Sequence, residues 1–347
     1  MNPPFRADQV GSLLRPSYLA NDRKNRELQD RAIAEAIRKQ EEVGLESITD
    51  GEFRRDWWHL DFLTQIEGVG ARVNPGPKFG GTEEQPPIPI VTGKLRYAKP
   101  IMVEDFAFLK SKTGKTAKYT IPSPSMLHLR AGRAGISYQD MDEYWSDAAA
   151  VYRDAIAAFA KAGCTYLQLD DVAFAYLCDP KIRETCRKNG DDPATLPGRY
   201  AETIRESLKS KPKDMVVAMH TCRGNFKSAW VAAGGYEPVA EAMFSSGVDA
   251  FFMEFDTERA GGFEPLRFVP KGKKVVLGIM SSKVGVLESR DDLKKRIDQA
   301  AKFVPLEDLC LSPQCGFSST HHGNQLTQDE QWRKLERVVQ TAKEVWR

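Results

Sequence analysis

The chain has 347 residues, enough for one large domain or two ordinary ones, and 41% of them are hydrophobic, which suffices for a sizeable core. Its 50 Lys and Arg nearly balance 48 Asp and Glu, so the net charge is +2. This balance gives no reason to expect a nucleic-acid or membrane partner. No run of about 18 apolar residues occurs, so no membrane-spanning helix is expected.

The six cysteines are spread along the chain, without the density of a disulfide scaffold. Residues 1–16 lack the basic start, apolar core and cleavage site of a secretory signal. We therefore expect a cytoplasmic protein with free thiols.

Short apolar segments flanked by turn residues are expected to be strands, in chain order at residues 7–12, 47–52, 118–122, 165–171, 215–222, 250–256, 275–281 and 309–314. Amphipathic stretches between them predict helices at residues 26–44, 141–163, 199–209, 236–247, 291–303 and 328–346. Gly163 stands where a helix C-cap would be.

Alternating strands and helices indicate parallel strands with helical crossovers, and eight of them in a chain of this length fit a (β/α)8 TIM barrel. We predict one such domain over residues 1–347. An excursion near residues 68–118, rich in Pro, Gly and Lys, is expected to be a hairpin or lid. A doubly wound open sheet is the alternative, but no G-x-G-x-x-G or G-x-x-x-x-G-K-[ST] loop follows any strand.

Polar and sulfur-bearing residues end several of these strands, at the face that carries the active site in such barrels. His220 and Cys222 end one strand, Glu254 lies in the next, and Cys315 follows the last. Alternation along a strand places His220 and Cys222 on the same side. Imidazole, carboxylate and two thiolates suit zinc, so these four residues are candidate ligands.

Plainer interpretations exist for the same residues. A cysteine in a strand is often just a small core residue, and a buried Glu254 could instead pair with an arginine. The aromatic residues Phe53, Trp57, Trp58 and Phe62 could line a pocket or belong to a helix core.

The motifs D-x-V-G-S, T-D-G-E, L-Q-L-D-D, H-T-C and P-Q-C-G-F, in this order along the chain, resemble the catalytic barrel of cobalamin-independent methionine synthase and related single-barrel proteins. The resemblance implies zinc held by His220, Cys222, Glu254 and Cys315. In that family zinc binds the homocysteine thiol as the thiolate that attacks a methyl group. Gly11, Ser12, Glu52 and Asp170 match the residues that hold the polar end of homocysteine, and Asp170 is also a candidate catalytic residue.

The sequence departs from this family on the methyl-donor side. It has room for one barrel, whereas full-length synthases have two. Near the position of the Trp on which the pterin stacks, the chain has His128, which we take as a candidate substrate-binding residue. The aspartate-histidine-serine segment used for acid catalysis is replaced by Ser281, Ser282 and Lys283. Lys283 is the candidate to supply a proton or hold an anionic group, unless it is a solvated surface residue.

The expected activity is therefore zinc-dependent methyl transfer to a thiol, homocysteine first, as in 5-methyltetrahydropteroyltriglutamate-homocysteine S-methyltransferase. The alternative is alkyl transfer to another thiol or from a methylcorrinoid, a methoxy compound or an epoxide. A metal hydrolase or lyase, and a binding or methyl-carrier protein with structural zinc, are the competing classes. The expected partners are a small thiol and a methyl donor, with a corrinoid protein or a second copy of the chain left open.

Overall fold

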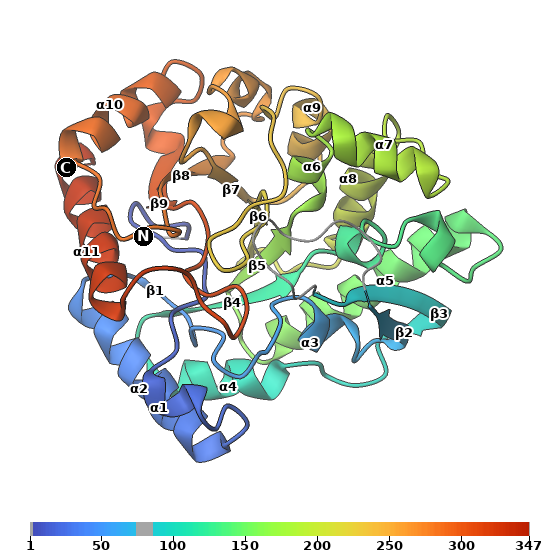
Figure 1. The fold of residues 1–347 in the computed structure, drawn as a ribbon, viewed down its shortest axis with the longest axis horizontal. Coiled ribbons are helices and arrows are strands. Elements are labelled where there is room, and N and C mark those ends of the chain that lie inside the picture. Colours follow the sequence, from blue (N-terminus) through green and yellow to red (C-terminus); the bar gives the residue numbers. More distant parts are fainter. Residues whose placement is uncertain (1–2, 74–85, 347) are drawn as a thin grey trace.

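The computed structural model describes residues 3–73 and 86–346, and a curled seven-stranded sheet in the order β1-β4-β5-β6-β7-β8-β9 lies at its centre (Figure 1). Every neighbouring pair in this sheet is parallel. The strands are β1 (Ser47–Ile48), β4 (Thr116–Pro122), β5 (Tyr166–Asp171), β6 (Val216–Thr221), β7 (Ala250–Glu254), β8 (Lys274–Met280) and β9 (Leu309–Pro313).

Helices surround the sheet and alternate with its strands along the chain (Figure 1). The longer ones are α2 (Arg26–Glu42), α4 (Val103–Lys112), α5 (Met141–Lys161), α7 (Pro180–Lys188), α8 (Leu196–Ser207), α10 (Arg290–Ala300) and α11 (Gln328–Val345). Short ones are α1 (Ser17–Ala20), α3 (Leu60–Leu63), α6 (Ala173–Tyr176) and α9 (Ala240–Phe244). The predicted TIM-barrel fold is confirmed, although α4 and α7 were not foreseen and α9 is shorter than predicted.

The first predicted strand, residues 7–12, is an extended segment with a single bridge, Ala7 to Leu311 of β9. Backbone hydrogen bonds of 2.9 Å join the N–H of Asp8 and the carbonyl of Arg6 to Leu311, and the carboxylate of Asp8 accepts the N–H groups of Phe5 and Gln9. On its other side, the carbonyl of Gly11 accepts the Thr49 hydroxyl at 2.7 Å. The segment therefore occupies the eighth position of the barrel, between β9 and β1.

The predicted excursion contains an antiparallel hairpin, as expected, followed by α4. Its strands are β2 (Glu67–Arg72) and β3 (Ile88–Arg96). The Pro- and Gly-rich residues 74–85 lie outside the described part of the chain.

Helix α5 shows how local sequence sets the element boundaries. The Asp140 side chain accepts the N–H of Asp142 at the N-terminus. At the other end, Gly163 adopts a φ of 81°, and the N–H of Cys164 bonds to the carbonyl of Phe159. This is a Schellman motif, and the predicted C-cap at Gly163 is confirmed.

A buried charged network fills part of the barrel interior. The fully buried Nζ of Lys118 on β4 lies 3.2 Å from the carboxylate of Asp8. Ser47 of β1 and Tyr166 of β5 donate hydroxyl groups to the same carboxylate, at 2.7 and 2.9 Å. Asp8 therefore ties the irregular first segment to three strands.

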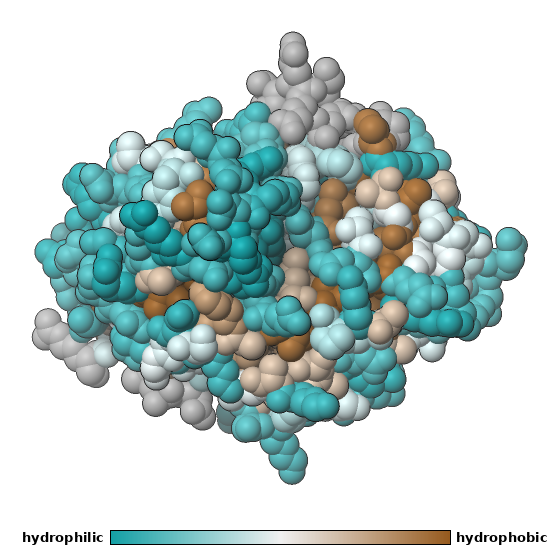
Figure 2. Space-filling view, turned by 90° about the horizontal axis from the view of Figure 1, so that it is seen from below, coloured by the Kyte–Doolittle hydropathy of each residue, from teal (hydrophilic) through white to brown (hydrophobic). Residues whose placement is uncertain are grey.

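No helix in the described part of the chain is long and apolar enough to cross a membrane. The face shown in Figure 2 is largely hydrophilic, with apolar side chains in separate patches.

Removing one partner of the buried pair should leave a charge unpaired inside the barrel. We expect Lys118→Met to lower the free energy of unfolding by about 3–5 kcal/mol. Lys94→Met is the control, because Lys94 pairs with Glu143 at the surface, and its loss should change the free energy of unfolding far less. Urea denaturation measures both, and equal losses would contradict the role of the Asp8 network.

Candidate functional site

The polar ends of several strands meet at one edge of the sheet. Parallel register places Asp170 of β5 beside His220 of β6, and Glu254 ends β7. Cys222 follows β6 and Cys315 follows β9. Because all these strands run the same way, their carboxyl ends lie together, as the sequence predicted.

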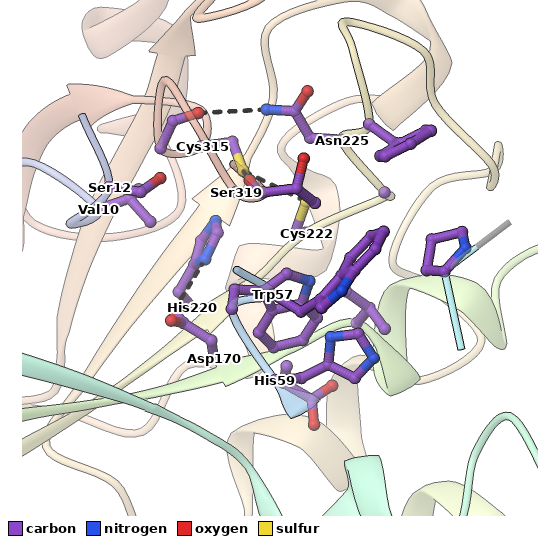
Figure 3. Close-up of a pocket in the computed structure, with 18 of the residues that line it drawn as sticks. Val10, Ser12, Trp57, His59, Asp170, His220, Cys222, Asn225, Cys315 and Ser319 are labelled. Atoms are coloured by element: carbon purple, nitrogen blue, oxygen red, sulfur yellow. Dashed lines mark hydrogen bonds and ion pairs between the residues drawn. The ribbon is translucent and has the colours of Figure 1, made fainter. Parts of the chain in front are cut away.

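His220, Cys222 and Cys315 form a compact buried group whose ligand atoms all lie within 4.8 Å of one another. The two sulfur atoms are 3.5 Å apart (Figure 3). Their hydrogen bond lowers the pKa of Cys315 to about 6 and raises the pKa of Cys222. At neutral pH the two sulfur atoms therefore share one proton. All six cysteines of the chain are free thiols in the structure.

His220 is oriented by Asp170. The Nδ1 atom of His220 lies 3.2 Å from an Asp170 oxygen, which also accepts the side-chain amide of Gln168 at 2.7 Å. The other ring nitrogen, Nε2, lies 3.2 Å from the carbonyl of Gln314, the residue before Cys315. A carboxylate on the far nitrogen is the usual partner of a histidine that binds metal.

Glu254, the fourth candidate ligand, is fully buried but is not part of this compact group. Arg259 and Lys283 pair with its Oε1, with Lys283 at 3.3 Å, and the backbone N–H of Arg223 donates to its Oε2 at 2.9 Å. The arginine pairing considered from the sequence is therefore present. Burial alone would raise the pKa of Glu254, but Lys283 and Arg259 outweigh it and lower the pKa.

Lys283 is not the solvated surface residue that the sequence allowed, because it is only 7% exposed. Its Nζ also lies 3.8 Å from Asp256. It is not among the residues that line the cavity described below. The structure thus directs Lys283 at two carboxylates rather than into the cavity.

A cavity opens beside the compact group and brings most of the predicted substrate residues together (Figure 3). It is lined by Val10, Ser12, Glu52, Trp57, Trp58, His59, Pro86, Arg130, Asp170, Asp171, Val172, Tyr176, His220, Cys222, Gly224, Asn225, Phe226, Cys315, Gly316, Ser319 and Thr320. Of the four aromatic candidates, Trp57 and Trp58 line this cavity, whereas Phe53 and Phe62 belong to the core.

The predicted turn with Glu52 is strained, and it holds this carboxylate at the cavity. Glu52 has a φ of 60°, which is rare for a residue with a side chain. Its Oε1 accepts the hydroxyl of Thr120 at 3.0 Å. A Cβ atom on Gly11 would lie 2.8 Å from Thr120 and 3.1 Å from Glu52, so a glycine is needed there.

His128, the other predicted substrate residue, does not line the cavity. It is 1% exposed, and its ring nitrogens lie 2.9 Å from the Tyr200 hydroxyl and 3.2 Å from an Asp191 oxygen. The ring also packs on Trp145. The structure therefore places His128 in a buried cluster with Tyr200, Asp191 and Trp145, and not in the lining of the cavity.

Arg15 was missed by the sequence reasoning. Its guanidinium donates to the carbonyls of Glu52 and Arg55, at 2.8 and 2.7 Å. It also donates to the Ser318 hydroxyl at 2.8 Å and the Thr320 carbonyl at 3.2 Å. Arg15 thereby joins the Glu52 turn to the loop that carries Cys315, and an arginine three residues after the V-G-S turn was the only signal.

The compact group fits a metal with a preference for sulfur and nitrogen. Its two thiols and one imidazole can reach a common centre, and Asp170 already supports the imidazole. This donor set is typical of zinc, and three protein ligands leave a position open for a substrate. His220, Cys222 and Cys315 are thus the residues that could hold such an ion.

Comparisons with known proteins identify the family of the chain. Residues 13–344 match the family described as "Cobalamin-independent synthase, Catalytic domain". The chain is 45% identical to the uncharacterized protein YxjH of Bacillus subtilis, over 99% of this chain and 95% of the relative. A solved structure from Listeria monocytogenes, a putative vitamin-B12 independent methionine synthase, is 39% identical, has a TM-score of 0.79 and covers 100% of this chain and 99% of its own.

A longer relative carries an assigned activity. The 5-methyltetrahydropteroyltriglutamate–homocysteine methyltransferase of Bacillus velezensis is 22% identical over 88% of this chain, which spans 36% of that enzyme. The chain therefore belongs to the cobalamin-independent synthase family, whose activity is methyl transfer of the methionine-synthase type.

The shared proton of the two thiols can be tested in the metal-free protein. Iodoacetamide at pH 7 should alkylate Cys315 first, because its pKa of about 6 leaves it mostly thiolate, whereas burial raises the pKa of Cys164 and Cys310 to about 12. Cys222→Ala removes the hydrogen bond and should slow alkylation of Cys315. Peptide mass spectrometry over time measures both, and unchanged Cys315 alkylation in the variant would contradict the shared proton.

Proposed function

We propose, from the chain's membership of the cobalamin-independent synthase family, that it transfers a methyl group to the zinc-bound thiol of homocysteine and so forms methionine. The observation that carries the proposal is one cavity lined both by His220, Cys222 and Cys315 and by the acidic residues Glu52 and Asp170. A thiol group and an amino-acid ammonium therefore have partners within a single site.

His220, Cys222 and Cys315 would hold the zinc ion, and Glu254 stays the predicted fourth ligand, which would then share its charge with Arg259 and Lys283. When bound, zinc lowers the pKa of a substrate thiol and keeps it as a nucleophilic thiolate. Two sulfur ligands favour this role over the activation of water, which usually relies on histidine and carboxylate ligands.

The polar end of the amino acid is expected to bind to acidic and hydroxyl side chains that line the same cavity. Glu52 and Asp170 line the cavity and offer carboxylates to an ammonium group, and Ser12 offers a hydroxyl to a carboxylate. The thiolate sulfur forms a bond to the methyl carbon, the bond between that carbon and the donor breaks, and the donor keeps the electron pair.

The decisive experiment supplies zinc-loaded protein with homocysteine and a panel of donors, including 5-methyltetrahydrofolate and methylcobalamin. Mass spectrometry should detect methionine, and elemental analysis should find one zinc per chain. Cys315→Ser should lose both zinc and activity. Cys186→Ser is the matched control, because Cys186 is a buried cysteine on α7 that does not line the cavity.

Two outcomes would contradict the proposal. The first is full activity of the metal-free protein, and the second is a zinc-loaded protein that forms no thioether from any donor of the panel.

Glu52 should give thiol binding a pH dependence. Burial, only partly offset by Arg55, raises the pKa of Glu52 to about 7, with Asp170 adding to the rise. The carboxyl group is therefore neutral below pH 7 and charged above it, and an ammonium group binds the charged form. The Kd of homocysteine should fall as the pH rises from 6 to 8, and Glu52→Gln should make this fall shallower, leaving the part that comes from release of the thiol proton on binding to zinc. Calorimetry measures the Kd, and an unchanged pH profile in the variant would exclude this role.

A further inference from the structure

Arg15 links two loops that line the cavity, although it does not line the cavity itself. Each terminal nitrogen of a guanidinium group carries two N–H groups. One terminal nitrogen of Arg15 donates to the carbonyls of Glu52 and Arg55. The other donates to the Ser318 hydroxyl and to the Thr320 carbonyl. Each nitrogen therefore serves a different loop, and all of these N–H groups are used.

The first loop holds the Glu52 carboxylate, and its backbone is held from both sides. Glu52 has a φ of 60°, and such a strained conformation persists only where its surroundings stabilise it. The Asp50 carboxylate accepts the N–H of Glu52 at 2.9 Å. The carbonyl of Glu52 accepts the N–H of Arg55 at 3.1 Å and the guanidinium of Arg15 at 2.8 Å. Arg15 thus stabilises the backbone conformation from which Glu52 reaches the cavity.

The second loop follows Cys315 and contacts its sulfur atom. Ser318 and Thr320 flank Ser319, whose hydroxyl oxygen lies 3.7 Å from the sulfur of Cys315 (Figure 3). The Ser318 hydroxyl also donates to the Thr320 carbonyl at 2.8 Å. Arg15 therefore binds the residues on both sides of Ser319, and these bonds hold the loop in place beside Cys315.

The separation between these two loops matters for a ligand that binds to both. In the proposed reaction, the thiol group lies at the Cys222–Cys315 pair and the ammonium group lies at Glu52. Cysteine carries the same two groups as homocysteine but is shorter by one methylene group. A site with a fixed separation cannot satisfy both ends of both amino acids, so it can select by chain length.

We propose that Arg15 is a positioning residue that fixes the separation between the Glu52 carboxylate and the Cys222–Cys315 pair, and that it thereby selects homocysteine over cysteine. The proposal rests on the proposed function, because it needs the two ends of an amino acid to be bound in one cavity. A lysine at this position could not do the same, since an ammonium group is a single point charge, whereas the planar guanidinium presents donors to both loops.

Calorimetric titrations of zinc-loaded protein with homocysteine, cysteine and 2-mercaptoethanol test this role without relying on turnover. The parent should bind homocysteine at least about tenfold more tightly than cysteine, the lower end of what one methylene group usually provides. Arg15→Lys should reduce this ratio by about threefold or more, the usual worth of one hydrogen bond. The Kd of 2-mercaptoethanol, which has no amino-acid end, and the zinc content should not change.

Ser318→Ala is a second variant, which decides the question if Arg15→Lys does not fold. It removes one acceptor of the Arg15 guanidinium and should change the ratio in the same direction but less. Arg133→Lys is the matched control. Arg133 also donates to two backbone carbonyls, those of Ile136 and Tyr138 at 2.7 and 2.9 Å, but it does not line the cavity, so the ratio should stay at the parent value.

Three results would overturn the role of Arg15. They are a parent that binds cysteine as tightly as homocysteine, variants that keep the parent's ratio, and variants that lose affinity equally for all three thiols, as a purely structural residue would. Selective binding of homocysteine without methionine formation would contradict the proposed function alone. A zinc-loaded parent that binds neither amino acid would contradict both.

Discussion

The approach of Cys222 and Cys315 to 3.5 Å between sulfur atoms is the contact on which the rest of the site depends. The two residues follow β6 and β9, which are separated by β7 and β8 in the sheet. Only a strongly curled sheet brings the ends of such strands together. The barrel is thus a requirement of the site, and every feature that closes it also sets the distance between the two thiols.

Basic side chains on two sides link this contact to the neighbouring elements. Arg15 donates hydrogen bonds to carbonyls of the Glu52 turn and to the loop after Cys315. These bonds fix the position of Glu52 relative to Cys315. Close packing adds to this, because a Cβ on Gly316 would lie 1.9 Å from the Ser12 hydroxyl. On the other side, Arg259 and Lys283 neutralise Glu254, which lets a buried carboxylate lie near the thiol pair of Cys222 and Cys315.

Much of the site could be predicted because strand periodicity and strand ends determine where side chains meet. His220, Cys222 and Cys315 converge as expected, and Ser12, Glu52 and Asp170, which the family resemblance assigned to substrate, line the same cavity. The partners of Glu254 and Lys283 could not be predicted, since ion pairs between distant segments depend on tertiary packing. His128 was assigned by its place in the sequence, yet its ring packs against Trp145 and Tyr200 and does not line the cavity.

In the fold, too, regular elements could be predicted from the sequence, whereas features that depend on tertiary packing could not. The regular strands follow from apolar patterning, whereas residues 7–12, predicted as a strand, form an isolated bridge from Ala7 to β9 and contain Gly11, whose φ is 152°. Such irregular pairing depends on the tertiary fold and leaves no periodic signal in the sequence.

X-ray absorption at the zinc edge, with and without homocysteine, tests the central claim most directly. The account predicts two sulfur ligands and one imidazole in the resting protein, from Cys222, Cys315 and His220, and a third sulfur ligand after homocysteine is added. A sulfur count that stays at two in the presence of saturating homocysteine would contradict thiol activation at this centre.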